Sequence, residues 1–590
     1  MKDLFLVTTA IEDSLSDNDL RTIFLGKWCK SLYESKKFMH HDFLIQDYVW
    51  DTRERIPKDY QYISHVYEFF LEELTEVLNE YHGEEHKKKF WRILIGMWLG
   101  WFIQISYERW LSILSLEKRE ESIHTKIIDF KEDEFLPNDM LSFDQLIYTD
   151  RFNHYLFSEI IQFRKKFSFE EVSDEGVKQA VEEVSPQKNI FKRTVRRLIN
   201  RFNLIFLKNQ KYFFINSGMQ RFNLLLFQIL LGQMPYFAES TDLDLTKISK
   251  DRSNFRINVD SEDEFIKFLQ TQIERLIPLV YIEGFKELSI RSKEVGWPKN
   301  PKSIWTSYSF FIDEIFKYWS ARLLENQDTK LIVSQHGGLI STSRWEFSED
   351  HEKEISDIYF SWGWQRDEKV LPYPVRGFIE KIPKVNKNEN LALVQMKMPR
   401  YSYHMLCAPI SGQYLDYLEN QFNFVEELSD EIRSKSIVRF KKNPYGWQED
   451  QIWLRKFSDI NLDPGESSIK DCINNSRIYV CTYNATTFLE SFFMNHPTIL
   501  FWNEKFSELN DDAKPYFEGL KKINLFFDDP IKAANFINSI WHDVDSWWEE
   551  AIRQKEYKEF REMYCRMPVN LGIRDLMKLK KLFLKELKED

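Results

Sequence analysis

Short apolar runs alternate with helix-length segments along most of the chain. Runs of this length, bounded by polar or turn residues, are typical of buried β-strands. The clearest are residues 4–8, 22–25, 303–310, 330–334, 357–362, 391–396, 436–441, 478–482 and 498–502. Strands that alternate with helices predict parallel sheets joined by crossover helices. We therefore expect an α/β protein.

Between about residues 60 and 235 the pattern is helical instead, with long segments at 65–81 and 90–116. This predicts a large helical insertion. Residues 167–187 are rich in Glu, Val and Lys, which favours an exposed helix or a mobile connection. Residues 381–390 are polar and contain Pro and Asn, so they are the best linker candidate.

The expected architecture is therefore two Rossmann-like domains. Residues 1–385 would form an N-terminal, acceptor-side α/β domain that carries the insertion at about 60–235. Residues 386–590 would form a C-terminal α/β domain that binds the donor nucleotide. In doubly wound sheets the ligand cleft lies at the carboxyl ends of the strands.

Composition and charge narrow the class of protein. A chain of 590 residues is too long to fold around a single hydrophobic core. Its content of 43% hydrophobic and 29% charged residues is typical of a folded protein. The net charge of −12 argues against broad nucleic-acid binding, which depends on neutralising phosphates. The five cysteines are scattered without a CxxC pair, which disfavours disulfides and zinc sites and favours a reducing cytoplasm.

Nothing at the N-terminus has the basic start, long apolar stretch and cleavage site of a signal peptide. The most apolar segment, residues 90–114, has an uncharged core of 15 residues. Crossing a bilayer takes roughly 20 residues, so a buried helix is the better interpretation. We expect a cytoplasmic protein, and peripheral contact with the inner membrane stays open.

The sharpest motif is the stretch Asn484-Ala-Thr486-Thr487 between a predicted strand and a predicted helix. Free backbone N–H groups and the helix dipole favour an anion at such a helix N-terminus. Glu490, one turn further along the same face, is placed to reach a ribose hydroxyl. The alternative is that Asn484 or Thr486 simply caps the helix.

A second motif, Gln335-His336-Gly337-Gly338, directly follows a predicted strand. The glycines allow a sharp turn and close approach of a ligand, and an imidazole suits proton transfer at neutral pH. A histidine that only hydrogen-bonds within a turn is the alternative. A carboxylate from the run 349–352 could orient His336, although a solvated helix start is the favoured interpretation of that run.

Arg439 and Lys441 alternate along a predicted strand, so both could neutralise leaving-group phosphates. Tyr445 and Trp447 could stack on a base. The alternative is an edge strand whose charges discourage aggregation. Thr8 and Thr9 follow the first strand and would face the same cleft, where they suit acceptor recognition.

Several motifs are missing from the sequence. It has no GxxxxGK[ST] loop, no HExxH and no GxGxxG after a strand, and no DxD stands in an obvious strand–loop setting; the one in TDLDL is incidental. We therefore expect neither a metal nor a cofactor. Helix dipoles and cations would stabilise the phosphate instead.

The set LVTTA…FLGKWC, SQHGG…EDHE…DIYFSWGW, NATTFLE…NHPTILFW and DVDSWW resembles a family of transferases of bacterial O-antigen and surface-carbohydrate biosynthesis, nearly end to end. More distantly, the layout is similar to cytidine-nucleotide users of the GT-B fold: capsule Kdo transferases, polysialyltransferases and CDP-glycerol glycerophosphotransferases. That likeness implies His336 as acid/base and Thr486 and Thr487 as phosphate binders. Where those families carry Arg-x-His-Pro, this chain has Arg439-Phe-Lys-Lys-Asn-Pro.

The resemblance implies a glycosyltransferase that uses a nucleotide-sugar donor, with cytidine as the nucleotide, and a polysaccharide or lipid-linked glycan acceptor such as O-antigen or lipopolysaccharide. It also implies a C-terminal helix, around Trp547, that crosses back to the first domain. Two rivals remain: a CDP-polyol phosphotransferase, and a non-catalytic scaffold of the polysaccharide machinery.

Overall fold

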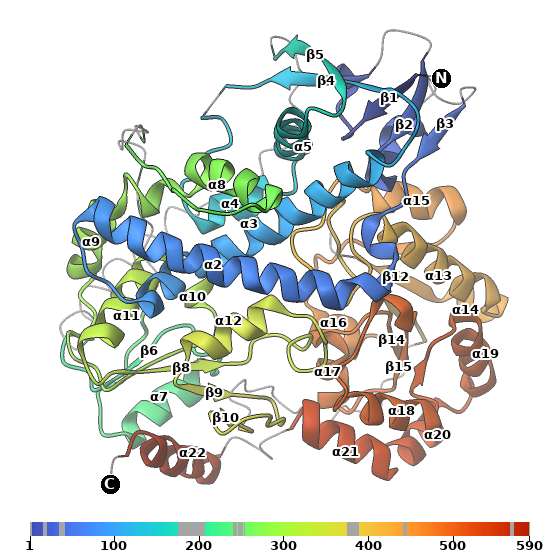
Figure 1. Cartoon of the computed structure of the whole chain (residues 1–590). Coiled ribbons are helices and arrows are strands. Elements are labelled where there is room, and N and C mark those ends of the chain that lie inside the picture. The colour runs from blue at the N-terminus through green and yellow to red at the C-terminus, as the bar shows by residue number, and fades with distance from the viewer. Residues whose placement is uncertain are drawn as a thin grey trace, which may run out of the picture.

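The protein folds around three parallel β-sheets rather than two (Figure 1). The computed structural model describes residues 3–15, 20–34, 42–131, 133–174, 207–239, 243, 245, 252, 254–373, 389–440, 445–566 and 572–588. The predicted linker lies almost entirely outside these ranges. Mixed α/β structure with parallel sheets is confirmed.

The N-terminal sheet has the strand order β3-β2-β1-β4-β5. Its strands are β1 (Leu4–Val7), β2 (Arg21–Phe24), β3 (Phe43–Ile45), β4 (Ile123–Asp129) and β5 (Ser168–Ser173). The strand order reverses between β1 and β4, which pair in parallel. β1 is buried along its whole length, whereas β5 is an exposed edge strand.

The middle sheet follows the chain in sequence, in the order β10-β9-β8-β7-β6. Its strands are β6 (Tyr212–Phe214), β7 (Ser303–Thr306), β8 (Lys330–Ser334), β9 (Ile358–Phe360) and β10 (Val370–Leu371). β8 is therefore the central strand, and its last four residues are buried.

The C-terminal sheet has the order β13-β12-β11-β14-β15-β16 and reverses direction between β11 and β14. Its strands are β11 (Leu391–Val394), β12 (Ser436–Arg439), β13 (Asn461–Asp463), β14 (Ile478–Cys481), β15 (Thr498–Phe501) and β16 (Phe526–Phe527). β12 lies between β11 and β13, so the edge-strand interpretation of this segment is wrong.

Helices cover and connect the sheets. In the first part of the chain these are α1 (Lys30–Tyr33), α2 (Ile56–His82), α3 (Lys88–Leu116), α4 (Met140–Leu146) and α5 (Asp150–Arg164). Around the middle sheet they are α7 (Arg221–Leu230), α8 (Glu264–Leu276), α9 (Phe285–Glu294), α10 (Ser309–Ile312), α11 (Glu314–Asn326) and α12 (Phe347–Ile355). The remainder are α13 (Gln413–Glu427), α14 (Asp430–Ser434), α15 (Glu449–Lys456), α16 (Ile469–Asn474), α17 (Thr486–Phe493), α18 (Lys514–Lys522), α19 (Pro530–Ile540), α20 (Val544–Ala551), α21 (Lys555–Tyr564) and α22 (Ile573–Glu586).

The expected helical insertion is narrower than residues 60–235. β4, β5 and β6 fall inside that range and divide the described helices into the pair α2 and α3, the pair α4 and α5, and α7. For residues 167–187, expected to be an exposed helix or a mobile connection, the structure shows the strand β5 at the start, and most of the stretch lies outside the described residues. β5 is short and contains two glutamates, so it lacks the apolar run by which a strand is recognised in the sequence.

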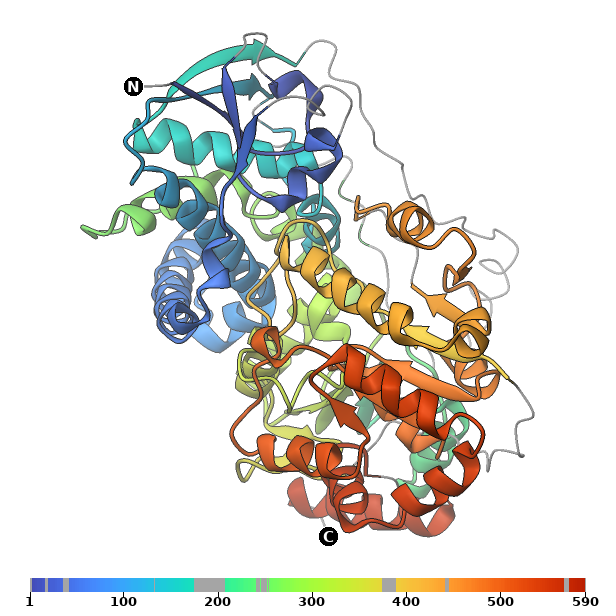
Figure 2. The ribbon, with the colours of Figure 1, turned by 90° about the vertical axis from the view of Figure 1, so that its right-hand side faces the viewer.

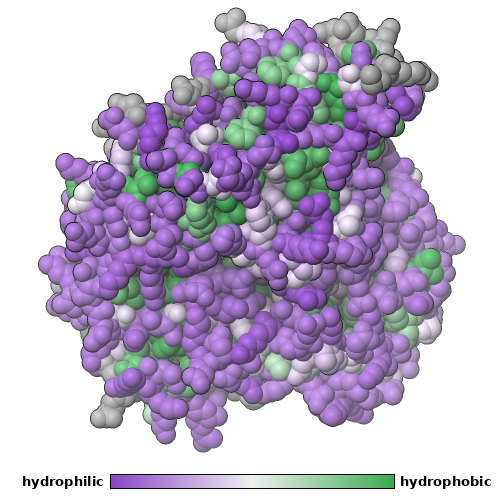
Figure 3. Space-filling model, viewed as in Figure 1, coloured by the Kyte–Doolittle hydropathy of each residue, from purple (hydrophilic) through white to green (hydrophobic). Residues whose placement is uncertain are grey.

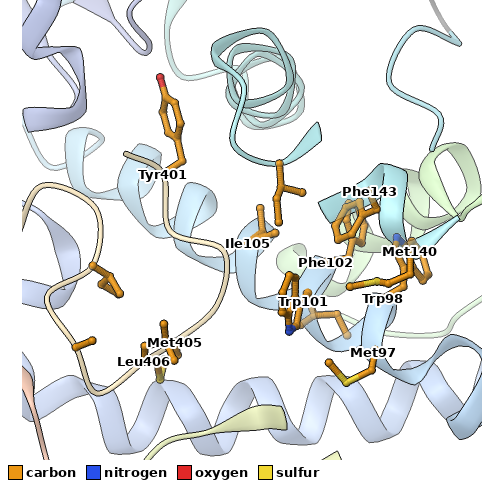
Figure 4. Close-up of a cluster of buried hydrophobic side chains, with 14 of the residues drawn as sticks. Met97, Trp98, Trp101, Phe102, Ile105, Met140, Phe143, Tyr401, Met405 and Leu406 are labelled. Carbon is orange, nitrogen blue, oxygen red and sulfur yellow. The ribbon is translucent and has the colours of Figure 1, made fainter. Parts of the chain in front are cut away.

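α3 is the central helix of the molecule and is buried on nearly every side, as expected of residues 90–114. It packs on α5 of the N-terminal part and on α11 and α12 beside the middle sheet. Figure 4 shows Phe102 of α3 close to Phe143 of α4, with ring centroids 6.2 Å apart. Helices with apolar residues all round belong in the interior of large proteins. Among the described helices, none is long and apolar enough to span a membrane.

The C-terminal part lies alongside the other two sheets, in orange and red in Figure 2. The helix that returns to the middle sheet is α22, whose Phe583 stacks on Trp305 of β7. Trp547 belongs to α20, which stays with the C-terminal sheet and packs on Phe536 of α19. The crossing back therefore occurs later in the chain than the segment around Trp547.

Candidate functional site

The turn after β8 is held rigidly by the side chain of Gln335. Its amide nitrogen donates to the carbonyl oxygens of Gly337 (2.8 Å) and Ile340 (3.1 Å). Its amide oxygen accepts from the backbone of Trp362 (2.9 Å) and the indole of Trp364 (2.8 Å). Gln335 is buried, so it shapes the turn and does not face a substrate.

His336 follows Gln335 and is about one-third exposed, with its Nδ1 3.2 Å from the Glu352 carboxylate. Glu352 is fully buried on α12, where the Tyr359 hydroxyl donates to its other oxygen (2.9 Å). The favoured interpretation of residues 349–352 as a solvated helix start is wrong, because Glu349 and Glu352 are both buried. A histidine with a fixed carboxylate behind it is a standard arrangement for proton transfer.

The Asn484–Thr487 motif forms the start of α17, at the point where the C-terminal sheet reverses its strand order. The N-cap residue is Ala485, and no side chain in the described part of the chain caps the helix. The interpretation of Asn484 or Thr486 as a simple N-cap is therefore wrong. Ligands of doubly wound sheets bind at such reversal points, beside helix N-termini.

The two motifs meet directly. The backbone N–H of Gly338 donates to Thr486 Oγ1 (2.9 Å), and Asn484 Nδ2 donates to Thr342 Oγ1 (2.9 Å). A β-carbon on Gly338 would lie 2.8 Å from the carbonyl carbon of Ala485, so only glycine allows this approach. The middle and C-terminal sheets thus share one interface at these loops.

Residues that the sequence analysis missed extend this interface. Asn510 Nδ2 donates to the carbonyl of Ser343 (2.7 Å), and Arg366 bridges Glu349 (3.1 Å) to Asp512 (2.8 Å). Ser341 has a φ of 92°, a strained backbone for a residue other than glycine. No sequence signal marks these residues, because their partners are distant in the chain.

The other donor-side candidates lie around the end of β14. Thr487 Oγ1 donates to the Tyr483 hydroxyl (3.1 Å), while Glu490 is buried. Arg439 is largely buried and ion-paired with Asp463, and it donates to Ser467 Oγ (2.9 Å). Lys441 lies outside the described residues. Burial raises the pKa of Tyr483, and the Arg439 cation opposes that rise.

Trp447 is buried and its indole donates to the Met398 carbonyl (3.0 Å), so it is packed in the core and does not stack on a base. Thr8 and Thr9 are also buried, with their hydroxyls 3.2 and 3.4 Å from His154 Nδ1. They lie at the carboxyl end of the N-terminal sheet, whereas His336 follows the central strand of the middle sheet.

A row of aromatic rings connects His336 to the other two sheets. Tyr308, after β7, lies 5.5 Å from the His336 ring and 5.4 Å from Phe311, which in turn contacts Trp101 (5.1 Å). Trp101 contacts Tyr403 after β11 (5.2 Å). Several of these rings are partly exposed.

The row continues from Tyr403 to Tyr148, with ring centroids 5.8 Å apart, and from Tyr148 to Tyr445, 5.0 Å apart. Lys397 Nζ lies 4.7 Å from the centroid of the Tyr445 ring. Tyr148 also donates to Asp144 (2.8 Å). Burial raises the pKa of Asp144, and it raises that of Tyr308 to about 12.

Two further titratable groups are buried close to His336. Burial raises the pKa of Glu346 to about 8 and lowers that of His351 to about 3. Among the described residues, neither ring nitrogen of His351 has a hydrogen-bond partner. Across the described ranges, no group of three or more His, Cys, Asp or Glu side chains is placed to hold a metal ion.

Comparison with solved structures finds remote similarities. The wall teichoic acid polymerase TagF has 10% identity over 68% of this chain and 95% of that chain, with a TM-score of 0.29. MurG of Acinetobacter baumannii has 8% identity over 63% and 98%, with a TM-score of 0.32. WaaG, a glycosyltransferase involved in lipopolysaccharide biosynthesis, has 10% identity over 60% and 97%, with a TM-score of 0.26.

A comparison with curated protein sequences gives no match. By contrast, the profile of the LIC12162 family of transferases matches residues 4–579, nearly the whole chain. The protein therefore belongs to the LIC12162 family of transferases.

Proposed function

We propose that this transferase is a glycosyltransferase of the GT-B type, which moves a sugar from a cytidine-nucleotide donor to a bacterial surface polysaccharide such as O-antigen. The observation that carries the proposal is the contact between Gly338 and Thr486. It sets a histidine backed by a carboxylate beside an uncapped helix N-terminus, across an interface between two sheets.

In the proposed reaction, the donor's phosphate lies at the N-terminus of α17, where the helix dipole and first-turn N–H groups offset its charge. The acceptor hydroxyl gives its proton to His336 Nε2, on the far side of the ring from Glu352. The acceptor oxygen then bonds to the anomeric carbon, and the bond from that carbon to the phosphate oxygen breaks. The nucleotide leaves with the bonding electrons.

The acceptor would lie along the partly exposed rings beside His336. Tyr308 is the most exposed ring of the row, and Asp144 and Lys397 supply polar groups near its far end. Aromatic faces stack well on the apolar faces of sugar rings. The hydrogen bond of Gln335 to the turn would keep His336 aimed at this surface.

A thermal-shift screen with CMP, CDP, UDP, GDP and their sugars tests the donor, because a ligand that binds only the folded state raises the melting temperature. We expect cytidine nucleotides to give the largest shift, and Thr486→Val to reduce it. No shift with any nucleotide would contradict the proposal.

His336→Ala should abolish transfer and keep the nucleotide-induced shift. His542→Ala, at an exposed histidine remote from the site, is the matched control and should change neither. Release of CMP together with a phosphodiester product would show phosphotransfer and reject glycosyl transfer.

A further inference from the structure

The outer faces of α7 and α22 carry an apolar surface that no other described element covers. Phe222 and Ile229 of α7 are 69% and 56% exposed, and Ile573 of α22 is 64% exposed. Soluble proteins seldom expose several large apolar side chains together. Elsewhere the molecule is mostly hydrophilic on the face shown in Figure 3, with apolar side chains in small groups.

The exposed side chains form stripes. On α7, Phe222, Leu225, Leu226 and Ile229 are partly or fully exposed, and their spacing places them on one face of the helix. The opposite face is buried: Phe227 packs on Trp305 and on Phe583 of α22.

The same division holds on α22. Ile573 and Met577, four residues apart, are exposed, whereas Leu576, Leu579 and Phe583 are buried against the middle sheet. Lys580 lies one turn beyond Met577, and its Nζ donates to the Leu230 carbonyl at the end of α7 (2.7 Å). The helices are therefore side by side, as Figure 1 also shows.

Positive charge flanks these stripes. α22 contains five Lys or Arg residues against two carboxylates, and α7 contains one Arg and no carboxylate, in a chain whose net charge is −12. The exposed cations are Arg221, Arg574, Lys578, Lys581 and Lys585. Lys578 approaches Asp575 at 3.5 Å, an exposed pair that salt and solvent weaken.

We propose that the α7–α22 surface docks the protein on a membrane rich in anionic lipids. Apolar side chains flanked by Lys and Arg are typical of helices that lie in the membrane interface. Cations near an anionic bilayer are attracted to its surface charge. A second copy of the chain is a poorer occupant, since a two-fold contact would bring the same cations together. This proposal is independent of the proposed glycosyl transfer.

Co-sedimentation with vesicles of phosphatidylcholine alone, or with phosphatidylglycerol added, tests the surface. The wild type should bind the anionic vesicles, and binding should weaken with salt. The double variant F222S/I573S should bind at least about ten-fold more weakly, because two side chains lose their apolar burial. The matched control is L454S/I531S, at comparably exposed residues of α15 and α19.

Reversing the charge of exposed lysines on α22 provides a second test of the proposal. K578E/K581E should weaken binding at least about ten-fold, and K286E/K555E, at exposed lysines of α9 and α21, should not. Unchanged melting temperatures show that the variants fold. The proposal is overturned if F222S/I573S binds like the wild type, if neutral vesicles bind equally well, or if sedimentation shows a dimer that F222S/I573S dissociates.

Discussion

His336 lies between two different surroundings, with a solvent-accessible edge toward Tyr308 and a buried carboxylate at Nδ1. The carboxylate cannot rotate away, because the Tyr359 hydroxyl donates to its second oxygen. A side chain held in this way positions the imidazole without touching a substrate. Glu352 is accordingly a positioning residue in the proposed reaction.

Glu352→Gln should lower kcat of the transfer reaction at least about ten-fold, because the amide no longer holds one orientation of the charged imidazole. KM for the donor should change little, since Glu352 lies on the His336 side of the interface. Steady-state kinetics separate the two constants. Glu354→Gln, exposed on the same helix, is the control. A rise in donor KM with constant kcat would instead indicate a role in binding.

Glu346 should make the protein less stable as the pH rises. Burial raises its pKa from 4.5 to about 8, so the folded protein holds a proton that the unfolded chain releases above pH 4.5. The free energy of unfolding should therefore fall between about pH 4.5 and 8, by at most about 1.4 kcal/mol per pH unit. Urea unfolding at pH 5, 6.5 and 8 measures this slope.

Glu346→Gln should flatten that slope and be the more stable variant at pH 8. Its side-chain oxygen can still accept the backbone N–H of Ser348, which caps α12 (3.1 Å). An identical pH dependence in wild type and variant would show that Glu346 is ionised in the folded protein.

At the level of elements, the candidate site depends on two turns that touch. The turn after β8 and the start of α17 approach each other closely enough that only a glycine fits at position 338. The contact fixes the distance between His336 and the helix N-terminus. Small displacements of reacting groups are costly in catalysis, so this spacing matters more than the strength of the bond itself.

Gly338→Ala should lower the free energy of unfolding by about 1–3 kcal/mol, because the new methyl group forces two backbone segments apart. Transfer should fall more than about ten-fold, since the proton acceptor and the phosphate site separate. Gly337→Ala should keep the wild-type stability, because its β-carbon would meet nothing closer than 3.7 Å. Equal stability of the two variants in urea would contradict the close contact.

At the scale of the whole molecule, the segment after β11 links all three sheets. Arg400 pairs with Asp150 of the N-terminal part, and Arg109 of α3 donates to the Ser402 hydroxyl (2.8 Å). Further along, Leu406 forms a bridge with Glu346, beside the middle sheet. The N-terminal and C-terminal sheets are therefore coupled through buried polar contacts as well as through α3.

Asp150→Asn should destabilise the protein by about 3 kcal/mol, because it leaves the largely buried Arg400 without its counter-ion. Asp416→Asn breaks another ion pair between the same two parts, with Lys27, but at an exposed position. There we expect a loss below about 1 kcal/mol. Denaturant unfolding compares the two, and similar losses would show that burial of the Asp150 pair is unimportant.

The local elements and their chemistry follow from the amino-acid sequence alone. Buried strands such as β8 and β14 appear in the sequence as short apolar runs, and α3 appears as a long apolar segment. An element that is buried as a whole has apolar residues at consecutive positions, so its burial can be recognised locally. The same logic predicted that α17 begins near Thr486 and that His336 follows a strand. These features require only contacts within one element.

The pairing of strands into sheets and the burial of particular charges emerge from the three-dimensional packing instead. The N-terminal half contains two sheets, because β1 to β5 pair among themselves and β6 to β10 pair among themselves. The charged edge strand β5 is defined by its pairing partner β4 rather than by its own residues. Glu352 looked solvated in its charged run, yet β9 and the turn after β8 enclose it. The contact of Gly338 with Thr486, and that of α7 with α22, join distant segments, and packing between such segments leaves no local trace in the sequence.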